Sequence, residues 1–208
     1  MIKFLDLIKQ DKKLHVPILK KINKLFKKGD FIMGKEVEIF EKNFSKFCES
    51  KYAISCANGT DALTLALKSL NLPKNSEVLI PAMTYCSTAF AVIEANLKPI
   101  LVDTEKLSST ISILDLEKKI TKKTKVILPV HLYGSAAKLK DIKRLIKNKK
   151  IYLIDDCAQA HGAYDGTDNY KKKIGSATDI SCFSLYPGKN LGAYGDAGII
   201  TTNNLNFY

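Results

Sequence analysis

Seven short apolar runs, most of them rich in β-branched residues, recur along the chain from residue 52 and mostly alternate with helical patterns. Strands that are apolar along their whole length are buried on both faces, and their alternation with helices is typical of a parallel sheet. The sequence therefore predicts an α/β fold, with a mainly parallel seven-stranded sheet and helices on both of its faces. The predicted strands are 52–56, 78–80, 100–102, 126–130, 151–154, 180–184 and 198–202.

Apolar residues spaced three or four apart predict the helices. Residues 1–50 form an N-terminal helical segment that is broken at Gly29-Asp30 and resumes from Lys35 to Cys48. Only a short loop separates the last two strands, too short for a crossover helix, which favours an antiparallel final strand. Further helices are predicted at 61–70, 84–95, 114–120 and 139–146.

The length of 208 residues and the 46% hydrophobic content allow one sizeable core. We expect residues 51–208 to form one large domain. The chain stops just beyond its last predicted strand, without a closing helix, which indicates a fragment. No apolar run approaches the roughly 20 residues that span a bilayer, and the first residues lack a signal-peptide core, so a cytoplasmic protein without a membrane partner is expected.

The formal net charge is +12, yet every basic residue except Arg144 is a lysine, and the lysines are scattered. Proteins that recognise nucleic-acid sequence rely on arginine forks, so we expect solvated lysines and no nucleic-acid partner. The alternative is attraction of an anionic substrate. Five cysteines without a CxxC pair suit reduced thiols, and no metal site is expected around His131 or His161, which lack a cysteine or carboxylate cluster at ligand spacing.

Lys189 stands on a loop between two glycines, after the apolar run 180–186. A lysine amine partly shielded from water can form a covalent imine with an aldehyde cofactor. Such chemistry requires a carboxylate that keeps a pyridine nitrogen protonated, and Asp156, at the end of the run 151–154, is the candidate. The two residues together predict pyridoxal phosphate as the cofactor.

Other side chains at predicted strand ends suit the same cofactor. Gly59 and Thr60 open a helix after the first strand, where free amides form an anion seat for a phosphate, although an ordinary helix cap has the same pattern. The hydroxyl of Ser184 can bind the same phosphate or the backbone. Tyr85 can stack on a planar ring or fill the core, and Gln159 can bind a ring oxygen or cap a turn. A Walker A loop and a GxSxG elbow are both absent from the sequence.

Taken together and in order, these motifs resemble the DegT/DnrJ/StrS family of pyridoxal-phosphate sugar aminotransferases, of the aspartate-aminotransferase (type I) fold. The resemblance covers nearly the entire chain. It is carried by Phe4-Leu-Asp-Leu7, Gly34-Lys-Glu-Val-Glu-Ile-Phe40, Asn58-Gly-Thr-Asp-Ala-Leu63, Pro81-Ala-Met-Thr84, Pro129-Val-His-Leu-Tyr-Gly134, Asp155-Asp-Cys-Ala-Gln-Ala-His-Gly162 and Pro187-Gly-Lys-Asn-Leu-Gly192 with Gly195-Asp196.

The resemblance implies two catalytic residues: Lys189, which forms the imine and moves the proton, and Asp156, which pairs with the pyridinium nitrogen. The remaining cofactor contacts that it implies are ring stacking by Tyr85, a contact of Gln159 with the ring oxygen, and phosphate binding by Gly59, Thr60 and Ser184.

The family aminates nucleotide-linked keto sugars, usually with glutamate as donor, at active sites on a homodimer interface. The resemblance therefore implies conversion of a nucleotide-linked keto-deoxyhexose to an amino sugar for surface polysaccharide, with 3-keto slightly favoured over 4-keto. Family members carry a C-terminal small domain that is absent here, so this piece alone is expected to lack part of the substrate site. Two alternatives stay open: an aminotransferase for a cyclitol or another ketone, and a non-catalytic regulator that binds pyridoxal phosphate. Relatives with histidine at the lysine position are dehydratases, and Lys189 argues against that activity.

Overall fold

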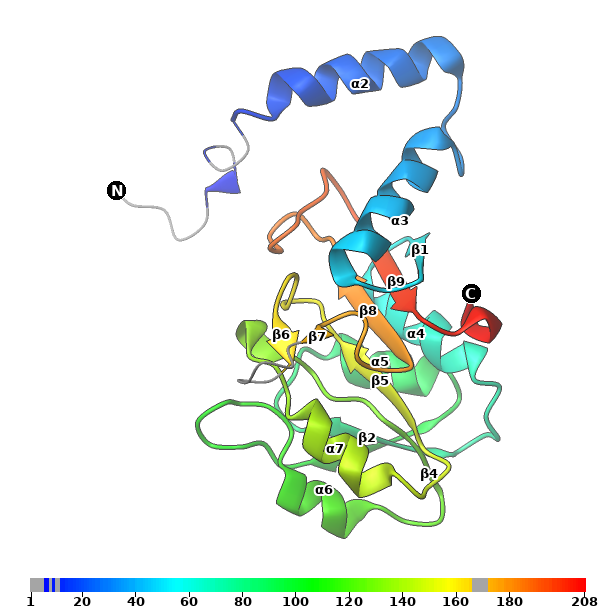
Figure 1. The fold of residues 1–208 in the computed structure, drawn as a ribbon, viewed down its shortest axis with the longest axis vertical. Coiled ribbons are helices and arrows are strands. Elements are labelled where there is room, and N and C mark those ends of the chain that lie inside the picture. The colour runs from blue at the N-terminus through cyan, green and yellow to red at the C-terminus, as the bar shows by residue number, and fades with distance from the viewer. Residues whose placement is uncertain (1–5, 8, 10–11, 166–171) are drawn as a thin grey trace.

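The computed structural model describes residues 6, 7, 9, 12–165 and 172–208. Helix α2 (His15–Lys28) stands away from the rest of the molecule, and α3 (Lys35–Cys48) leads from it to the body (Figure 1). The predicted break at Gly29-Asp30 is confirmed, because Gly29 ends α2 in a left-handed conformation with φ of 67°. Residues 4 and 5 of the motif at 4–7 lie outside the described residues.

A seven-stranded sheet forms the centre of the body, in the order β1-β9-β8-β5-β4-β2-β3. Neighbouring strands are parallel except where β9 pairs with β1 and with β8. The predicted fold class and the antiparallel final strand are therefore confirmed. The strands are β1 (Tyr52–Cys56), β2 (Glu77–Pro81), β3 (Lys98–Val102), β4 (Thr124–Ile127), β5 (Tyr152–Asp156), β8 (Ile180–Ser184) and β9 (Gly198–Thr202).

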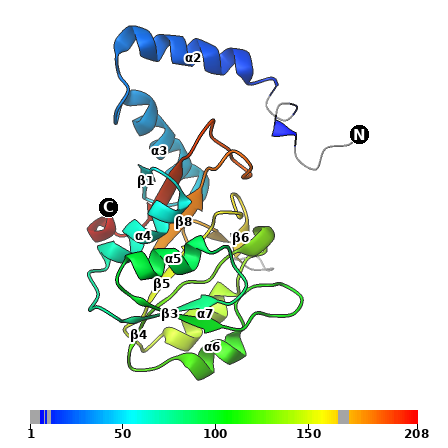
Figure 2. The ribbon, with the colours of Figure 1, turned by 180° about the vertical axis from the view of Figure 1, so that it is seen from behind.

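Helices cover both faces of this sheet. Figure 2 shows α4 (Gly59–Ser69) and α5 (Ser87–Glu94) on one face, and Figure 1 shows α6 (Ile113–Lys119) and α7 (Leu139–Ile146) on the other. Successive strand residues point to opposite faces, so each strand supplies two separate cores. This is why the strand sequences are continuously apolar. Leu79, Ile127 and Leu153 pack in the core with α6 and α7, whereas Val78, Ile80 and Val126 pack in the core with α4 and α5.

The bounds of β2, β3, β4 and β5 differ from the prediction, and the carboxyl ends of β4 and β5 bear on the site. Strand β4 ends at Ile127, three residues earlier than predicted, because Pro129 has no N–H for a ladder hydrogen bond. The chain stays beside the sheet nevertheless, since Val130 forms an isolated parallel bridge with Asp156. Strand β5 runs two residues further than predicted and ends at Asp156. The extra residues bring the two consecutive aspartates onto opposite faces of the sheet.

Helix α5 begins at Ser87, three residues later than predicted, because residues 84–86 form the turn after β2. Three short elements were not predicted. One is an antiparallel hairpin whose strands are only two residues long, β6 (Tyr164–Asp165) and β7 (Lys172–Lys173). The other two are single 3₁₀ turns, η1 (Leu132–Gly134) and η2 (Leu205–Phe207). Segments this short carry too few residues for a periodic pattern.

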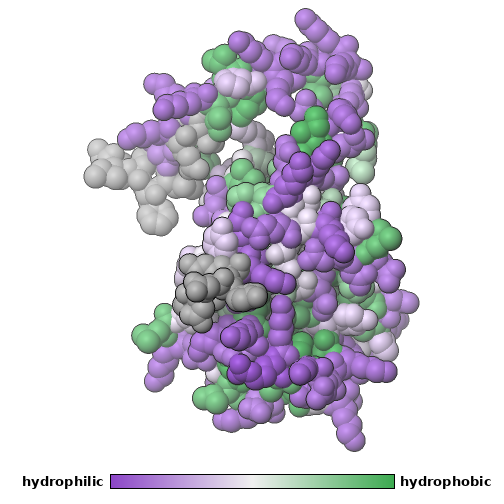
Figure 3. Space-filling model, viewed as in Figure 1, coloured by the Kyte–Doolittle hydropathy of each residue, from purple (hydrophilic) through white to green (hydrophobic). Residues whose placement is uncertain are grey.

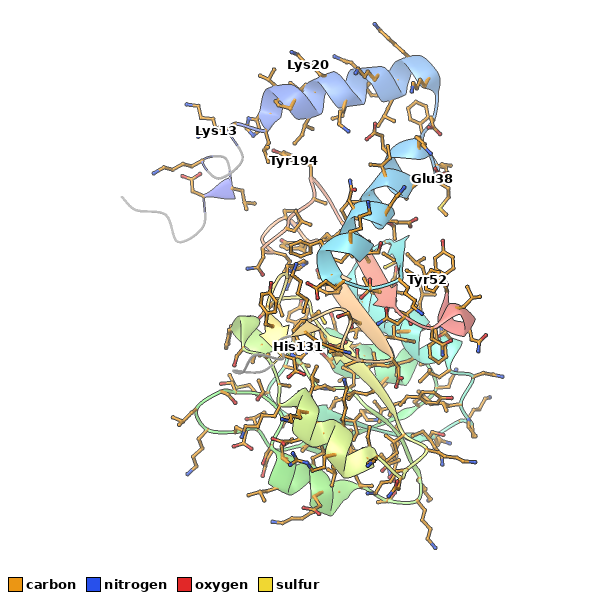
Figure 4. The ribbon with its side chains drawn as sticks, viewed as in Figure 1. Lys13, Lys20, Glu38, Tyr52, His131 and Tyr194 are labelled. Atoms are coloured by element: carbon orange, nitrogen blue, oxygen red, sulfur yellow. The ribbon has the colours of Figure 1, made fainter. Side chains whose placement is uncertain are left out.

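Hydrophilic side chains cover most of the face shown in Figure 3, in line with the scattered lysines of the sequence. Figure 4 places His131 inside the body, whereas Lys20 extends outward from α2. None of the residues of α2 is buried. Among the described residues, no helix combines the length and the apolar character that crossing a bilayer requires.

Candidate functional site

A cavity of about 660 Å³ opens where the carboxyl ends of β1, β5 and β8 meet the start of β9. Ligand sites of open parallel sheets lie at this edge, because loops after neighbouring strands converge there. All seven site residues predicted from the sequence line this one cavity: Gly59, Thr60, Tyr85, Asp156, Gln159, Ser184 and Lys189.

The N-terminus of α4 forms one wall of the cavity. Asn58 caps this helix, and its side-chain oxygen accepts a hydrogen bond of 2.8 Å from the backbone N–H of Asp61. The amides of Gly59 and Thr60 belong to the first turn, whose N–H groups have no acceptor within the helix and point toward an anion in front of it. A Cβ on Gly59 would lie 2.6 Å from Cβ of Ser184, so only glycine allows α4 to approach β8 this closely.

Asp156 forms the buried floor of the cavity, with 6% of its surface exposed. Its Oδ1 accepts a hydrogen bond of 3.0 Å from the backbone N–H of Ala158, and its Oδ2 accepts one of 2.9 Å from Oγ1 of Thr88. Burial raises the pKa of Asp156, and these hydrogen bonds together with the charge of Lys189 oppose the rise without reversing it. Burial is therefore the dominant influence on this carboxylate.

Asp155, the preceding residue, is fully buried on the opposite face of β5. Its carboxylate accepts hydrogen bonds from Nε2 of His131 at 2.9 Å and from Oγ1 of Thr178 at 2.7 Å. Burial acts to raise the pKa of Asp155, but hydrogen bonds from His131, Ser181 and Thr178 outweigh it and lower the pKa. Asp155 is thus a satisfied structural carboxylate, and Asp156 is the one available to a ligand.

His131, Asp155 and Cys157 bring their potential ligand atoms within 4.8 Å of one another. The expectation that no cysteine or carboxylate gathers around His131 was therefore wrong, because the cluster is assembled from two strand ends that are distant in sequence. Nδ1 of His131 accepts a hydrogen bond of 3.0 Å from the N–H of Ala137, so Nε2 carries the proton and donates to Asp155. This tautomer leaves the imidazole no lone pair for a metal ion.

Gln159 and Tyr85 occupy the upper part of the cavity. The Oε1 of Gln159 accepts a hydrogen bond of 2.6 Å from the N–H of Tyr133, a residue held at a φ of 55°. This bond orients the amide so that its NH₂ group is the end that can donate into the cavity. Tyr85 also lines the cavity, with 71% of its surface exposed, so its ring is accessible to a ligand.

The loop that carries Lys189 has a fixed base. The N–H of Lys189 donates to the carbonyl of Tyr186 at 2.8 Å, and the N–H of Ala193 donates to that of Leu185 at 2.7 Å. A Cβ on Gly192 would lie 2.4 Å from the carbonyl oxygen of Pro187, which explains the glycine that closes the loop. Lys189 is half-buried and lines the cavity, and its charge acts on Asp156.

Sequence reasoning missed three hydroxyl residues of the site: Thr84, Ser87 and Thr88. Thr88 is fully buried and links α5 to Asp156, and its Oγ1 also lies 2.8 Å from Oγ1 of Thr84. Ser87 lies 2.8 Å from the hydroxyl of Thr60 and so joins the starts of α4 and α5. The spacing of four between Thr84 and Thr88 was the available signal, since it places two hydroxyls on one side of a helix start.

Several known proteins are similar to this chain in sequence and in fold. A transaminase from Aneurinibacillus thermoaerophilus, named for dTDP-3-amino-3,6-dideoxy-alpha-D-galactopyranose, is 42% identical over 204 residues, which are 98% of this chain and 55% of that protein. The crystal structure of S. venezuelae DesV in complex with a ketimine intermediate has a TM-score of 0.93 and 35% identity, and covers 99% of this chain and 54% of that one. The structure of NtdA from Bacillus subtilis, solved with its bound cofactor PMP, has a TM-score of 0.88 and 32% identity. The match covers 99% of this chain and 46% of NtdA.

The chain thus spans about half the length of the relatives that it matches. The DegT/DnrJ/EryC1/StrS aminotransferase family matches residues 13–207, so the match includes every residue that lines the cavity. The family predicted from the sequence is confirmed, and this chain belongs to the DegT/DnrJ/EryC1/StrS aminotransferase family.

Proposed function

We propose that this chain is the cofactor-binding part of a pyridoxal-phosphate-dependent aminotransferase that converts a nucleotide-linked keto-deoxyhexose to the amino sugar. One observation carries the proposal: an amine, a buried carboxylate and the open N-terminus of a helix line the same cavity. These are Lys189, Asp156 and the first turn of α4. An aldehyde, a pyridine nitrogen and a phosphate are the groups that such a set can bind together.

The residues present fit pyridoxal phosphate. The raised pKa of Asp156 reflects a buried carboxylate in need of positive charge, and a protonated ring nitrogen would supply that charge. The amide NH₂ of Gln159 is oriented to donate to a ring oxygen. The amides of Gly59 and Thr60, with the hydroxyl of Ser184 beside them, form a seat for the phosphate.

Pyridoxal phosphate supplies an electron sink for the reaction when it is bound. The chemistry of this chain's own residues follows from their places in the cavity. Lys189 would hold the aldehyde through Nζ, and its amine, when free, could accept and donate a proton on its side of the cavity. Asp156 holds the proton on the ring nitrogen, and Thr88 and Ala158 keep its carboxylate oriented.

A 3-keto sugar as substrate is supported by the name of the 42% identical transaminase from A. thermoaerophilus. The proposal also includes glutamate as the amino donor and a role in polysaccharide biosynthesis. It further includes a homodimer and a cytoplasmic location. We also propose the division predicted from the sequence, with residues 1–50 as a helical segment and 51–208 as the domain that binds the cofactor. The exposed α2 and the buried sheet are consistent with this division.

Substitution of Lys189 by alanine tests the proposal. With pyridoxal phosphate, the wild-type protein should become yellow, and borohydride should trap a covalent adduct on Lys189. Lys189→Ala should give no adduct, whereas Lys173→Ala, which changes another half-buried lysine outside the cavity, should keep it. An adduct that persists in Lys189→Ala would refute the assignment. Loss of the yellow colour on addition of glutamate distinguishes a transaminase from a regulator that merely binds the cofactor.

A further inference from the structure

Three buried side-chain polar atoms have no hydrogen-bond partner among the described residues: Oγ of Ser55 and both ring nitrogens of His161. Native proteins contain few such atoms, because each loses its hydrogen bonds to water without replacement. A histidine with two unpaired nitrogens in the interior therefore requires an explanation. The mechanism described above does not use this residue.

Packing alone does not explain the histidine. The His161 ring contacts the rings of Phe183 and Phe44, with centroids 5.2 Å and 6.4 Å away. Both contacts are with aromatic rings, and an apolar side chain would serve them as well without burying unpaired nitrogens. Filling the space between α3 and β8 therefore does not account for the two nitrogens.

The neighbours of His161 indicate what its nitrogens can bind. The histidine follows Asp156 and Gln159 on the same segment. The Asn190 side chain and the Ser184 backbone approach the ring closely enough to raise its pKa, and the charge of Lys189 lowers it, although neither approach completes a hydrogen bond of full geometry. Burial lowers the pKa of His161 to about 4, so the ring is neutral, with one donor and one acceptor nitrogen. An asparagine side chain offers both matching groups, because its amide has an oxygen acceptor and an NH₂ donor.

A hydrogen bond to Asn190 would restrain the tip of the loop that carries Lys189. Backbone hydrogen bonds and Gly192 fix its base, whereas Asn190 and Leu191 at the tip are exposed. The amine of Lys189 sits next to this tip, and an imine forms efficiently only when the amine is held near the reacting carbon. A hydrogen bond between the Asn190 side chain, which already approaches the ring, and a His161 nitrogen would fix the tip.

We propose that His161 is a positioning residue that pairs with the Asn190 side chain and thereby holds the Lys189 loop, residues 187–192, with its amine directed into the cavity. The inference rests on the proposed function, since it concerns the covalent link between Lys189 and pyridoxal phosphate. It connects the segment that carries Asp156 with the loop that carries the amine.

Three variants separate this role from a structural one. His161→Phe and His161→Leu remove both nitrogens and keep apolar packing, whereas His161→Gln keeps a donor and an acceptor. Ser55→Ala is the matched control, because it removes the other unpaired buried atom, on β1, and Ser55 is not among the residues that line the cavity. The Tm is measured on cofactor-free protein, and the rate of link formation is measured from the absorbance rise after mixing with pyridoxal phosphate.

We expect at least one of the two apolar variants to keep or exceed the wild-type Tm while forming the link at least 10-fold more slowly. His161→Gln should recover most of the rate, and Ser55→Ala should keep the full rate. A folded apolar variant that forms the link at the wild-type rate would overturn the inference. So would a loss of Tm in both apolar variants that parallels their loss of rate. If wild-type protein forms no link at all, the proposed function itself fails, which is a distinguishable result.

Discussion

Asp155 and Asp156 are identical in type and adjacent in sequence, yet their environments shift their pKa values in opposite directions. The two-residue period of a strand sends them to opposite faces of β5. Asp155 meets His131 and Thr178 in a closed network, while Asp156 faces a cavity with only Thr88 and an amide for support. A carboxylate can bind a ligand only where its hydrogen-bond network within the protein is incomplete. Here a shift of one residue along β5 decides which of the two aspartates meets that condition.

His161 makes the stability of the cofactor-free protein depend on pH. Burial, reinforced by the charge of Lys189, lowers its pKa from 6.5 to about 4. Between these pH values the unfolded chain binds a proton on this ring and the folded chain does not. The free energy of unfolding therefore decreases as the pH falls through this window, by at most about 3 kcal/mol.

Urea unfolding at pH 7, 6, 5 and 4 measures this contribution when wild type is compared with His161→Phe. Other groups titrate in the same range in both proteins, so the difference between the two curves isolates the imidazole. We expect wild type to lose stability relative to the variant as the pH falls from 6.5 to 4. Parallel curves would show that the ring is protonated as readily in the folded chain as in the unfolded one.

At the scale of elements, the contact between α4 and β8 determines whether the phosphate seat exists. A Cβ on Gly59 would meet Cβ of Ser184 at 2.6 Å, and neither backbone can move freely because both elements are packed. We expect Gly59→Ala to lower stability by about 1–3 kcal/mol, as overpacking does, and to weaken binding of pyridoxal phosphate about 10-fold or more. Thermal unfolding and an absorbance titration measure the two effects.

Gly29→Ala is the control for this substitution. Gly29 has a φ of 67° and nothing within 4 Å of its added Cβ, so alanine there strains the backbone at the end of α2 without touching the cavity. This variant should lose some stability and retain full cofactor binding. Equal cofactor binding by Gly59→Ala and wild type would mean that the start of α4 does not hold the phosphate.

The local pattern of apolar residues was sufficient to predict some parts of the structure but not the contacts between distant residues. The amphipathic helices α3 and α7 have the bounds that their sequences predict, since their apolar stripes run from end to end. The role of Thr88 was not predicted, because its hydrogen bond to Asp156 joins residues 68 positions apart. The cluster around His131 arises in the same way. The predicted site residues lie at strand and helix ends or on the loops that follow them, and the parallel sheet gathers all seven in one cavity.

At the scale of the whole molecule, an apolar surface lies beside the cavity. Leu65 on α4 and Phe90 and Ile93 on α5 are each at least half exposed, and Tyr85 at the cavity mouth is 71% exposed. Helices α4 and α5 lie side by side on this face (Figure 2). Grouped apolar side chains on a surface mark interaction sites, and a second copy of this chain is the partner that the proposed homodimer requires.

A double substitution on α5, Phe90→Asp with Ile93→Asp, tests this arrangement. Burying two carboxylates in an apolar interface without partners is strongly unfavourable, so the variant should sediment as a monomer where wild type sediments as a dimer. If the partner completes the cavity, the variant should also bind pyridoxal phosphate more weakly, and wild-type binding should weaken on dilution into the monomer range. Leu107→Asp places one such carboxylate on a fully exposed loop residue and should change neither property. A double variant that keeps both the dimer mass and the cofactor affinity would place the interface on another face. A monomeric variant with unchanged affinity would mean that one chain alone completes the cofactor site.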